Sequence, residues 1–290
     1  MTVLPSVIPP EALLPLLADP RVVVLDATVR LERPPGGGPY RAVAARDGFL
    51  AAHIPGARFA DVVSELGRED GGRPFGIPPT TDAAEALRRL GVGDASTVVV
   101  YAQEGPMWAT RLWWLLRYWG LDDVSVLDGG LTTWRALDLP VEAGEPDAVP
   151  ESVPPTLRAR PELLVQLADV REVSEAGGAC LVNALGPEVF RGEGVTSYSR
   201  PGRIPGSVSS PWADIVDPGS QRFVATDDLR ATLAPLLEDP RPAPVVYCGG
   251  GISATVVLFG LHLLGRDDVR LYDGSLAEWS ADPSLPLEVG

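Results

Sequence analysis

Short apolar runs recur along the chain, and longer stretches in which apolar residues repeat at helical spacing lie between them. The runs at 22–25 and 98–101 consist of valine, leucine and tyrosine, which is typical of strands buried inside a sheet. The stretches from Ala109 to Trp119 and from Leu229 to Leu237 have the length and periodicity of helices. This alternation predicts an α/β fold with mainly parallel sheets flanked by helices.

The same order of segments occurs in both halves of the chain. Residues 98–102 match residues 244–248, and Asp-Gly-Gly-Leu at 128–131 matches Asp-Gly-Ser-Leu at 273–276. Two upstream segments match as well, namely 53–57 with 203–207 and 23–27 with 180–184. A repeated order of segments indicates a duplicated domain.

Composition excludes several classes of function. A formal net charge of −15 opposes binding to nucleic acid or to an anionic membrane. All 24 basic residues are arginine, so lysine Schiff-base chemistry is excluded. The two cysteines and two histidines lack the paired spacing of a metal site, and we expect neither a metal nor an organic cofactor. No signal peptide or membrane span is recognisable, so we expect a cytoplasmic enzyme.

Cys248 is the strongest candidate for chemistry. It ends the apolar run 244–247 and precedes three glycines and a second apolar stretch, an order that predicts a strand, a tight loop and the start of a helix. Loop N–H groups and the positive end of a helix stabilise a thiolate, the reactive form of cysteine. A cysteine that only packs needs no such glycines. We therefore interpret Cys248 as a nucleophile and predict a cradle of backbone amides formed by Gly249, Gly250, Gly251, Ile252, Ser253 and Ala254.

The duplication supplies an inactive counterpart, because Ala102 stands where the second copy has Cys248. Cys180 begins an apolar run without activating neighbours and is expected in the core. We predict a non-catalytic N-terminal domain over residues 1–143, a linker rich in proline, glycine and acidic residues over 144–159, and a catalytic C-terminal domain over 160–290. The N-terminal domain is expected to form one wall of the substrate cleft.

These motifs resemble the tandem rhodanese-like sulfurtransferases, which include thiosulfate and 3-mercaptopyruvate sulfurtransferases. The resemblance covers nearly the whole chain and rests on residues 53–57, 113–117, 127–134, 190–193, 248–254 and 272–279. It implies two rhodanese-like domains and a sulfurtransferase reaction without a cofactor. Cys248 is then expected to take a sulfane sulfur from a small anionic donor, 3-mercaptopyruvate or thiosulfate, and to pass it from a persulfide to cyanide or a thiol acceptor.

The resemblance also implies roles for residues around the cysteine. Arg200 and Arg191 are expected to bind the donor, although a solvated loop side chain is the alternative for each. Asp273 and Ser275 are expected to brace the catalytic loop through hydrogen bonds. For His53, a motif residue, we expect hydrogen bonds that shape its turn, with a proton donor from the facing domain as the alternative, and His262 is expected to pack within its helix or to snorkel.

Several positions depart from the family pattern. Gly250 replaces a serine of the mercaptopyruvate-type loop, Val189 replaces an arginine that binds the donor, and Arg203 replaces a histidine. The usual Asp-Ala-Arg after the first strand of this copy is Asn183-Ala184-Leu185. These departures keep open a weakly active or inactive member that carries sulfur or binds protein. A cysteine phosphatase shares the architecture, but it needs an arginine where Ala254 stands.

Overall fold

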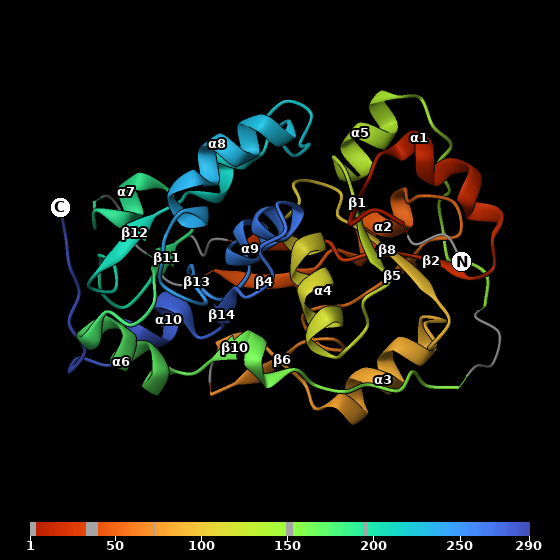
Figure 1. The fold of residues 1–290 in the computed structure, drawn as a ribbon. Coiled ribbons are helices and arrows are strands. Elements are labelled where there is room, and N and C mark those ends of the chain that lie inside the picture. The colour runs from red at the N-terminus through yellow and green to blue at the C-terminus, as the bar shows by residue number, and fades with distance from the viewer. Residues whose placement is uncertain (1–3, 33–39, 72, 149–152, 194–196) are drawn as a thin grey trace.

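The computed structural model describes residues 4–32, 40–71, 73–148, 153–193 and 197–290. In this part of the chain, two five-stranded parallel sheets lie side by side (Figure 1). The N-terminal sheet has the order β1-β9-β8-β2-β5, and the C-terminal sheet has the equivalent order β10-β14-β13-β11-β12. The predicted α/β fold with mainly parallel sheets is therefore confirmed, and the sequence repeat reappears as a repeat of topology.

The central strand of each sheet is almost entirely buried, since it has a strand on either side and helices over both faces. The N-terminal strands are β1 (Val7–Ile8), β9 (Val124–Leu127), β8 (Thr97–Tyr101), β2 (Val22–Asp26) and β5 (Arg58–Phe59). The C-terminal strands are β10 (Leu164–Val165), β14 (Arg270–Tyr272), β13 (Val245–Tyr247), β11 (Leu181–Asn183) and β12 (Ser207–Ser209).

Helices connect successive strands, and the two stretches predicted as helices appear as α4 and α8. The N-terminal helices are α1 (Pro10–Leu13), η1 (Leu14–Ala18), α2 (Arg46–Ala51), α3 (Thr80–Arg89), α4 (Met107–Tyr118) and α5 (Gly130–Ala136). The C-terminal helices are η2 (Pro161–Leu163), α6 (Leu167–Ala176), α7 (Pro187–Phe190), η3 (Trp212–Ile215), α8 (Thr226–Leu237), α9 (Ala254–Leu263) and α10 (Ser275–Trp279). None of the helices in the described chain is long and apolar enough to cross a bilayer.

Helices α4 and α9 pack against each other between the two sheets (Figure 1). Trp113 and Phe259 meet edge to face with ring centroids 4.8 Å apart. Thr110 and Thr255, which occupy equivalent positions in the two copies, share a hydrogen bond of 2.9 Å between their hydroxyls. A single apolar cluster runs through both domains. The N-terminal domain is thus held firmly beside the C-terminal one.

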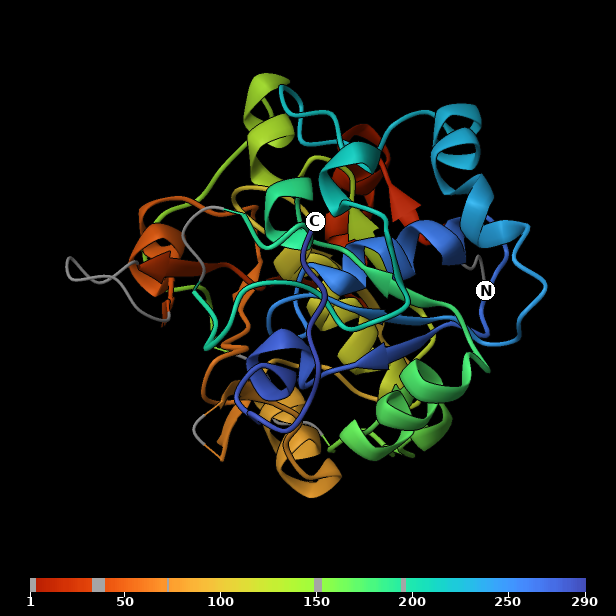
Figure 2. The same ribbon diagram turned by 90° about the vertical axis from the view of Figure 1, so that its left-hand side faces the viewer.

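Two antiparallel hairpins belong to the N-terminal domain. One consists of β3 (Val29–Glu32) and β4 (Arg41–Ala44), and the other of β6 (Arg68–Asp70) and β7 (Arg73–Gly76). Figure 2 views the molecule from the side of the C-terminal domain, with the hairpin of β3 and β4 (red-orange) at the left. Both hairpins contribute residues to the cavity described below.

The predicted linker, 144–159, includes residues 149–152, which lie outside the described residues. Its described parts contain no helix or strand. Near its end, the Arg158 N–H donates to the carbonyl of Trp119, at the end of α4, over 2.8 Å. The domain boundaries themselves stay a prediction.

Candidate active site

Cys248 follows directly on β13, and α9 begins at Ala254, so the predicted strand, loop and helix are all present. The residue is 2% exposed and lines a cavity of about 300 Å³ between the two domains. It stands at the carboxyl end of the central strand, the edge at which open parallel sheets bind their ligands. This position suits a nucleophile that must be reached by a small molecule and shielded from bulk water.

Ser275 holds in place the loop of residues 248–253 between β13 and α9, the predicted catalytic loop. Its Oγ accepts hydrogen bonds from the N–H groups of Cys248 and Gly251, each over 3.1 Å, and donates to the carbonyl of Tyr272 over 2.8 Å. The hydroxyl is fully buried, so these bonds are shielded from competing water. Ser275 therefore fixes the first and the fourth residue of the loop relative to each other.

The remaining loop amides are available to a ligand. Among the described residues, the N–H groups of Gly249, Gly250, Ile252 and Ser253 have no hydrogen-bond acceptor. N–H groups without an acceptor in the protein can pair with water or with a ligand in the cavity. A cluster of them beside a thiol is suited to stabilise the negative charge of a thiolate or a persulfide.

Close approaches explain two of the three glycines. A Cβ on Gly249 would lie 1.9 Å from the Tyr198 hydroxyl, and a Cβ on Gly251 would lie 2.2 Å from Asp273 Oδ1. Gly251 also has a φ of +75°, in the left-handed region that favours glycine. A Cβ on Gly250 would meet nothing within 4 Å, so this position alone has room for a side chain.

The cavity around Cys248 is largely apolar, and both domains contribute to it. Asp70 and Asp273 are its charged residues, and no arginine lines it among the side chains that the structure describes. The N-terminal domain provides Leu31, Tyr40, Asp70, Phe75, Gly76 and Met107, and the C-terminal domain provides Leu185, Ser197, Tyr198, Trp212, Ile252, Asp273, Gly274 and Ala277 together with the start of the catalytic loop.

Tyr198 lines the cavity, although no sequence pattern pointed to it. Burial raises the pKa of its phenol, and the neighbouring Cys248 raises it further. The phenol therefore stays protonated at neutral pH and can act only as a neutral hydrogen-bonding group. Its only sequence signal is its place two residues before Arg200.

The two arginines expected to bind the donor lie elsewhere. Arg200 donates to the carbonyls of Trp279, Ser280, Asp282 and Leu285 over 2.6–3.4 Å, which fixes the segment after α10. Arg191 pairs with Glu193 over 2.8 Å on the surface. Neither lines the cavity around Cys248. In the structure, the guanidinium of Arg200 is occupied by backbone carbonyls and that of Arg191 is paired with a neighbouring carboxylate, and donor binding by either residue stays a prediction.

The departures from the family pattern are accommodated locally. Asn183 Oδ1 accepts the N–H of Leu185 over 2.9 Å, and Leu185 lines the cavity. Arg203 stacks on Phe190, with its guanidinium 4.4 Å from the ring centroid. Val189, on α7, does not line the cavity.

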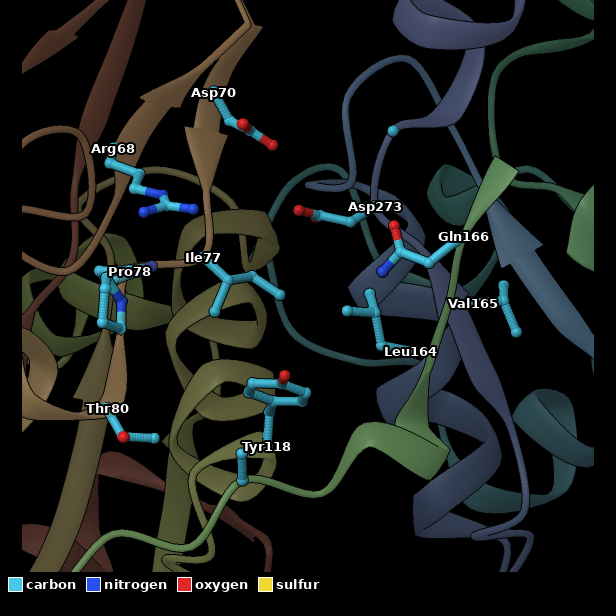
Figure 3. A pocket seen from close by; sticks show the side chains of 13 residues that line it. Arg68, Asp70, Ile77, Pro78, Thr80, Tyr118, Leu164, Val165, Gln166 and Asp273 are labelled. Atoms are coloured by element: carbon cyan, nitrogen blue, oxygen red, sulfur yellow. The ribbon is translucent and has the colours of Figure 1, made fainter. Parts of the chain in front are cut away.

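A second cavity of about 400 Å³ adjoins the first and shares Asp70, Asp273 and Gly274 with it. Figure 3 shows Arg68 and Asp273 extending into it from opposite domains. Burial raises the pKa of Tyr118 in its wall, and the charge of Asp273 adds to the rise. Cys248 does not line this cavity, so Asp70 and Asp273 stand between it and the thiol's own cavity.

The other candidate residues have structural surroundings. Nδ1 of His53 lies 2.8 Å from the carbonyl of Phe49, on whose ring it stacks. His262 lies at the domain interface, 2.9 Å from Ser6 Oγ and 2.5 Å from Asp267. Cys180 is buried, and burial raises the pKa of its thiol. In the described chain, no group of three or more His, Cys, Asp or Glu residues could hold a metal ion.

Comparison with known proteins identifies the family. The Rhodanese-like domain matches residues 9–137 and again 156–282. The chain is 34% identical over 274 residues to the 3-mercaptopyruvate sulfurtransferase of Escherichia coli K12, and the match covers 93% of each chain. It is 32% identical over 274 residues to a putative thiosulfate sulfurtransferase, SseB, of Mycobacterium tuberculosis, and this match covers 93% of this chain and 91% of the other. The crystal structure of SseA from Escherichia coli, a 3-mercaptopyruvate sulfotransferase by its description, superposes with a TM-score of 0.76 at 30% identity, covering 95% of this chain and all of the other.

The chain therefore belongs to the rhodanese-like family and carries two such domains in tandem. Within that family, its relatives and the structural neighbour SseA make it a sulfurtransferase.

Proposed function

We propose that the protein transfers a sulfane sulfur through a persulfide on Cys248, with 3-mercaptopyruvate or thiosulfate as donor and cyanide or a thiol as acceptor. The observation that carries the proposal is a cysteine at the end of the central strand, surrounded by loop amides without an acceptor in the described chain. The relatives named 3-mercaptopyruvate sulfurtransferase favour the first donor.

In the first half-reaction, the Cys248 thiolate attacks the outer sulfur of the donor. A sulfur–sulfur bond forms and the donor's bond to that sulfur breaks. With 3-mercaptopyruvate, the electrons of the broken carbon–sulfur bond stay on carbon as an enolate. This enolate takes up the proton of the donor thiol and leaves as pyruvate. With thiosulfate, the electron pair leaves on sulfite. In both cases the negative charge moves to the terminal persulfide sulfur, which the loop amides that Ser275 leaves free, those of Gly249, Gly250, Ile252 and Ser253, stabilise.

In the second half-reaction, the acceptor attacks that terminal sulfur. The sulfur–sulfur bond of the persulfide breaks and the Cys248 thiolate is regenerated. A cyanide acceptor is released as thiocyanate, and a thiolate acceptor is released as a persulfide. No metal or organic cofactor enters either step. The free thiol suits a reducing compartment, so we place the enzyme in the cytoplasm, acting on small molecules rather than on nucleic acid or membranes.

Mass spectrometry tests the proposal. After incubation with either donor, the protein is expected to gain one sulfur, about 32 Da, and to lose it on addition of cyanide. The variant Cys248→Ser should gain nothing, while Cys180→Ser should behave like the wild type. Absence of an adduct with both donors would exclude the proposed reaction.

A second candidate function is a sulfur carrier with weak activity toward small anionic donors. It is favoured by the absence of an arginine among the described side chains that line the cavity. Such a protein would still take up sulfur on Cys248 from a persulfide donor, but with a high KM for thiosulfate and 3-mercaptopyruvate. A cysteine phosphatase is disfavoured because Ala254 occupies the position of the required arginine.

A further inference from the structure

Arg111 lies on α4 of the domain without the cysteine, yet its guanidinium reaches the catalytic loop. Nη1 donates to Asp273 Oδ1 over 2.6 Å and to the carbonyl of Gly251 over 3.2 Å. Nη2 donates to the carbonyl of Phe75, in β7, over 2.6 Å. The side chain is 1% exposed. One buried charge therefore joins the catalytic loop, the turn after β14 and a hairpin that lines the cavity.

We propose that Arg111 is a positioning residue for sulfur transfer, through which the non-catalytic domain holds the catalytic loop in its reactive conformation. The inference rests on the proposed function of Cys248. Arg111 does not line the cavity, so it acts through the loop rather than on the substrate.

One peptide group of the loop, between Gly251 and Ile252, links Arg111 to the amide cluster. In a planar trans peptide, the C=O and the following N–H point in opposite directions. Arg111 holds the Gly251 carbonyl, so the N–H of Ile252 is directed away from Arg111, and Ile252 lines the cavity. Ser275 holds the N–H of the same glycine. Gly251 is thus fixed at both ends, although a glycine with a φ of +75° is otherwise free to rotate.

Asp273 completes the arrangement. Its carboxylate packs against the Cα of Gly251, at the position that a Cβ would occupy, and pairs with Arg111. The Asp273 side chain is 20% exposed, and it is the carboxylate partner of the buried Arg111 guanidinium, which would be costly to leave unpaired. Without Arg111, both the Gly251 carbonyl and Asp273 lose a donor, and the amide cluster loses the group that orients it.

The duplicated domain provides an internal comparison. Thr110 and Thr255 are equivalent and bond to each other across the interface. The next residue is Arg111 in the first copy and Val256 in the second. An arginine therefore stands at this position only in the copy without the cysteine, whereas the equivalent residue of the catalytic copy, Val256, is apolar. A purely structural tie between the domains gives no reason for this asymmetry.

The test compares variants of two arginines on the same helix. Arg117 also reaches the other domain, where Nη2 donates to Asp267 over 3.2 Å, but it touches no residue of the catalytic loop. The substitutions are Arg111→Gln, Arg111→Lys and, as the matched control, Arg117→Gln. The measurements are thermal unfolding, the single-turnover rate of persulfide formation by quenched mass spectrometry, and steady-state kcat and donor KM.

We expect Arg111→Gln to slow persulfide formation and to lower kcat at least about tenfold, while the donor KM changes less than about threefold. Arg111→Lys keeps the charge but not the planar fork, and should show an intermediate rate. Arg117→Gln should keep the wild-type rate even where it lowers the unfolding temperature.

Three results would overturn the inference. One is a wild-type rate in folded Arg111→Gln, and another is an equal loss of rate in Arg117→Gln. If Arg111→Gln does not fold, the rate of persulfide formation in Arg111→Lys replaces it as the test. A rate in Arg111→Lys within twofold of the wild type would then show that the planar guanidinium does not position the loop. Failure of the wild type itself to form a persulfide would instead reject the proposed function.

Discussion

Ser275 occupies in the second domain the place of Gly130 in the first, with almost the same backbone conformation: φ is +52° at Ser275 and +53° at Gly130. In the first copy the residue in this left-handed conformation is a glycine, which adopts it without strain. The second copy places a side chain there and accepts the strain, and its hydroxyl bonds to Cys248 and Gly251. Strained non-glycine residues of this kind cluster at functional sites.

Two substitutions at Ser275 separate the hydroxyl from the strain. Both Ser275→Ala and Ser275→Gly remove the bonds to the loop amides, so persulfide formation should slow about tenfold or more in each. Glycine also relieves the backbone strain, so Ser275→Gly should be more stable than Ser275→Ala by about 1 kcal/mol. Single-turnover mass spectrometry and urea unfolding measure the two effects. Equal stabilities would show that the φ of +52° carries no cost.

The three loop glycines should respond differently to substitution. Gly250→Ser should fold normally, since a Cβ there meets nothing within 4 Å and the residue lines the cavity. Gly249→Ala and Gly251→Ala should lose most activity, because each new methyl group would overlap Tyr198 or Asp273. Thermal unfolding and persulfide formation provide the readouts.

Gly250→Ser also restores the serine of the mercaptopyruvate-type loop. We expect it to raise kcat with 3-mercaptopyruvate and to leave kcat with thiosulfate unchanged, because only the first donor releases an enolate that must take up a proton. An equal change with both donors would contradict a role of the hydroxyl in handling the leaving group.

How far the sequence determines the site depends on the range of the interactions. The cysteine, its glycine loop and the residues after β14 lie in local patterns that occur twice in the chain, and these patterns predicted a strand, a loop and a helix start that the structure contains. Comparison with Ala102 separated the copy with a thiol from the copy without one. The parallel sheets followed from the apolar runs, since each central strand is buried on both faces.

Side-chain direction could not be read from position in the sequence. Arg200 stands where the family resemblance implies a donor contact, but its segment turns the guanidinium toward the carbonyls after α10. Arg111, Tyr198 and Phe75 reach the site only through tertiary packing, and no local pattern marks them. The sequence therefore did not indicate these three residues, two of which come from the N-terminal domain and one, Tyr198, from the domain of Cys248 itself.

The cavity around Cys248 should bind anionic donors better when it gains a positive charge. Leu185 lines the cavity, so Leu185→Arg places a guanidinium beside it. We expect the KM for thiosulfate and for 3-mercaptopyruvate to fall several-fold, which corresponds to about 1 kcal/mol for a partly exposed charge pair. The gain should shrink as ionic strength rises. Steady-state kinetics at two salt concentrations measure it.

Val189→Arg is the matched control, because Val189 stands at the family's arginine position but does not line the cavity. An equal gain in both variants would show that residue 189 reaches the donor after all. Unchanged kinetics in Leu185→Arg would show that the loop amides already supply the whole attraction for the donor.

Asp26 is fully buried at the end of β2, and its carboxyl group makes the stability of the protein depend on pH. Burial raises the pKa of this carboxyl, while hydrogen bonds from Thr28 oppose the rise. The folded state therefore holds the proton to a higher pH than the unfolded chain. The contribution of Asp26 to stability is greatest below its unfolded pKa and is lost as the pH rises through the folded one.

The second copy shows how to remove this dependence, because it has Asn183 at the equivalent position, with Oδ1 bonded to the N–H of Leu185 over 2.9 Å. Asp26→Asn should raise the free energy of unfolding at pH 7.5 by about 1–2 kcal/mol and should change it little near pH 4. Asn183→Asp is the reverse experiment, and its stability should fall as the pH rises. Urea unfolding between pH 4 and pH 8 tests both. Parallel curves for the wild type and Asp26→Asn would mean that Asp26 is ionised in the folded protein over this whole range, so that its hydrogen bonds outweigh its burial.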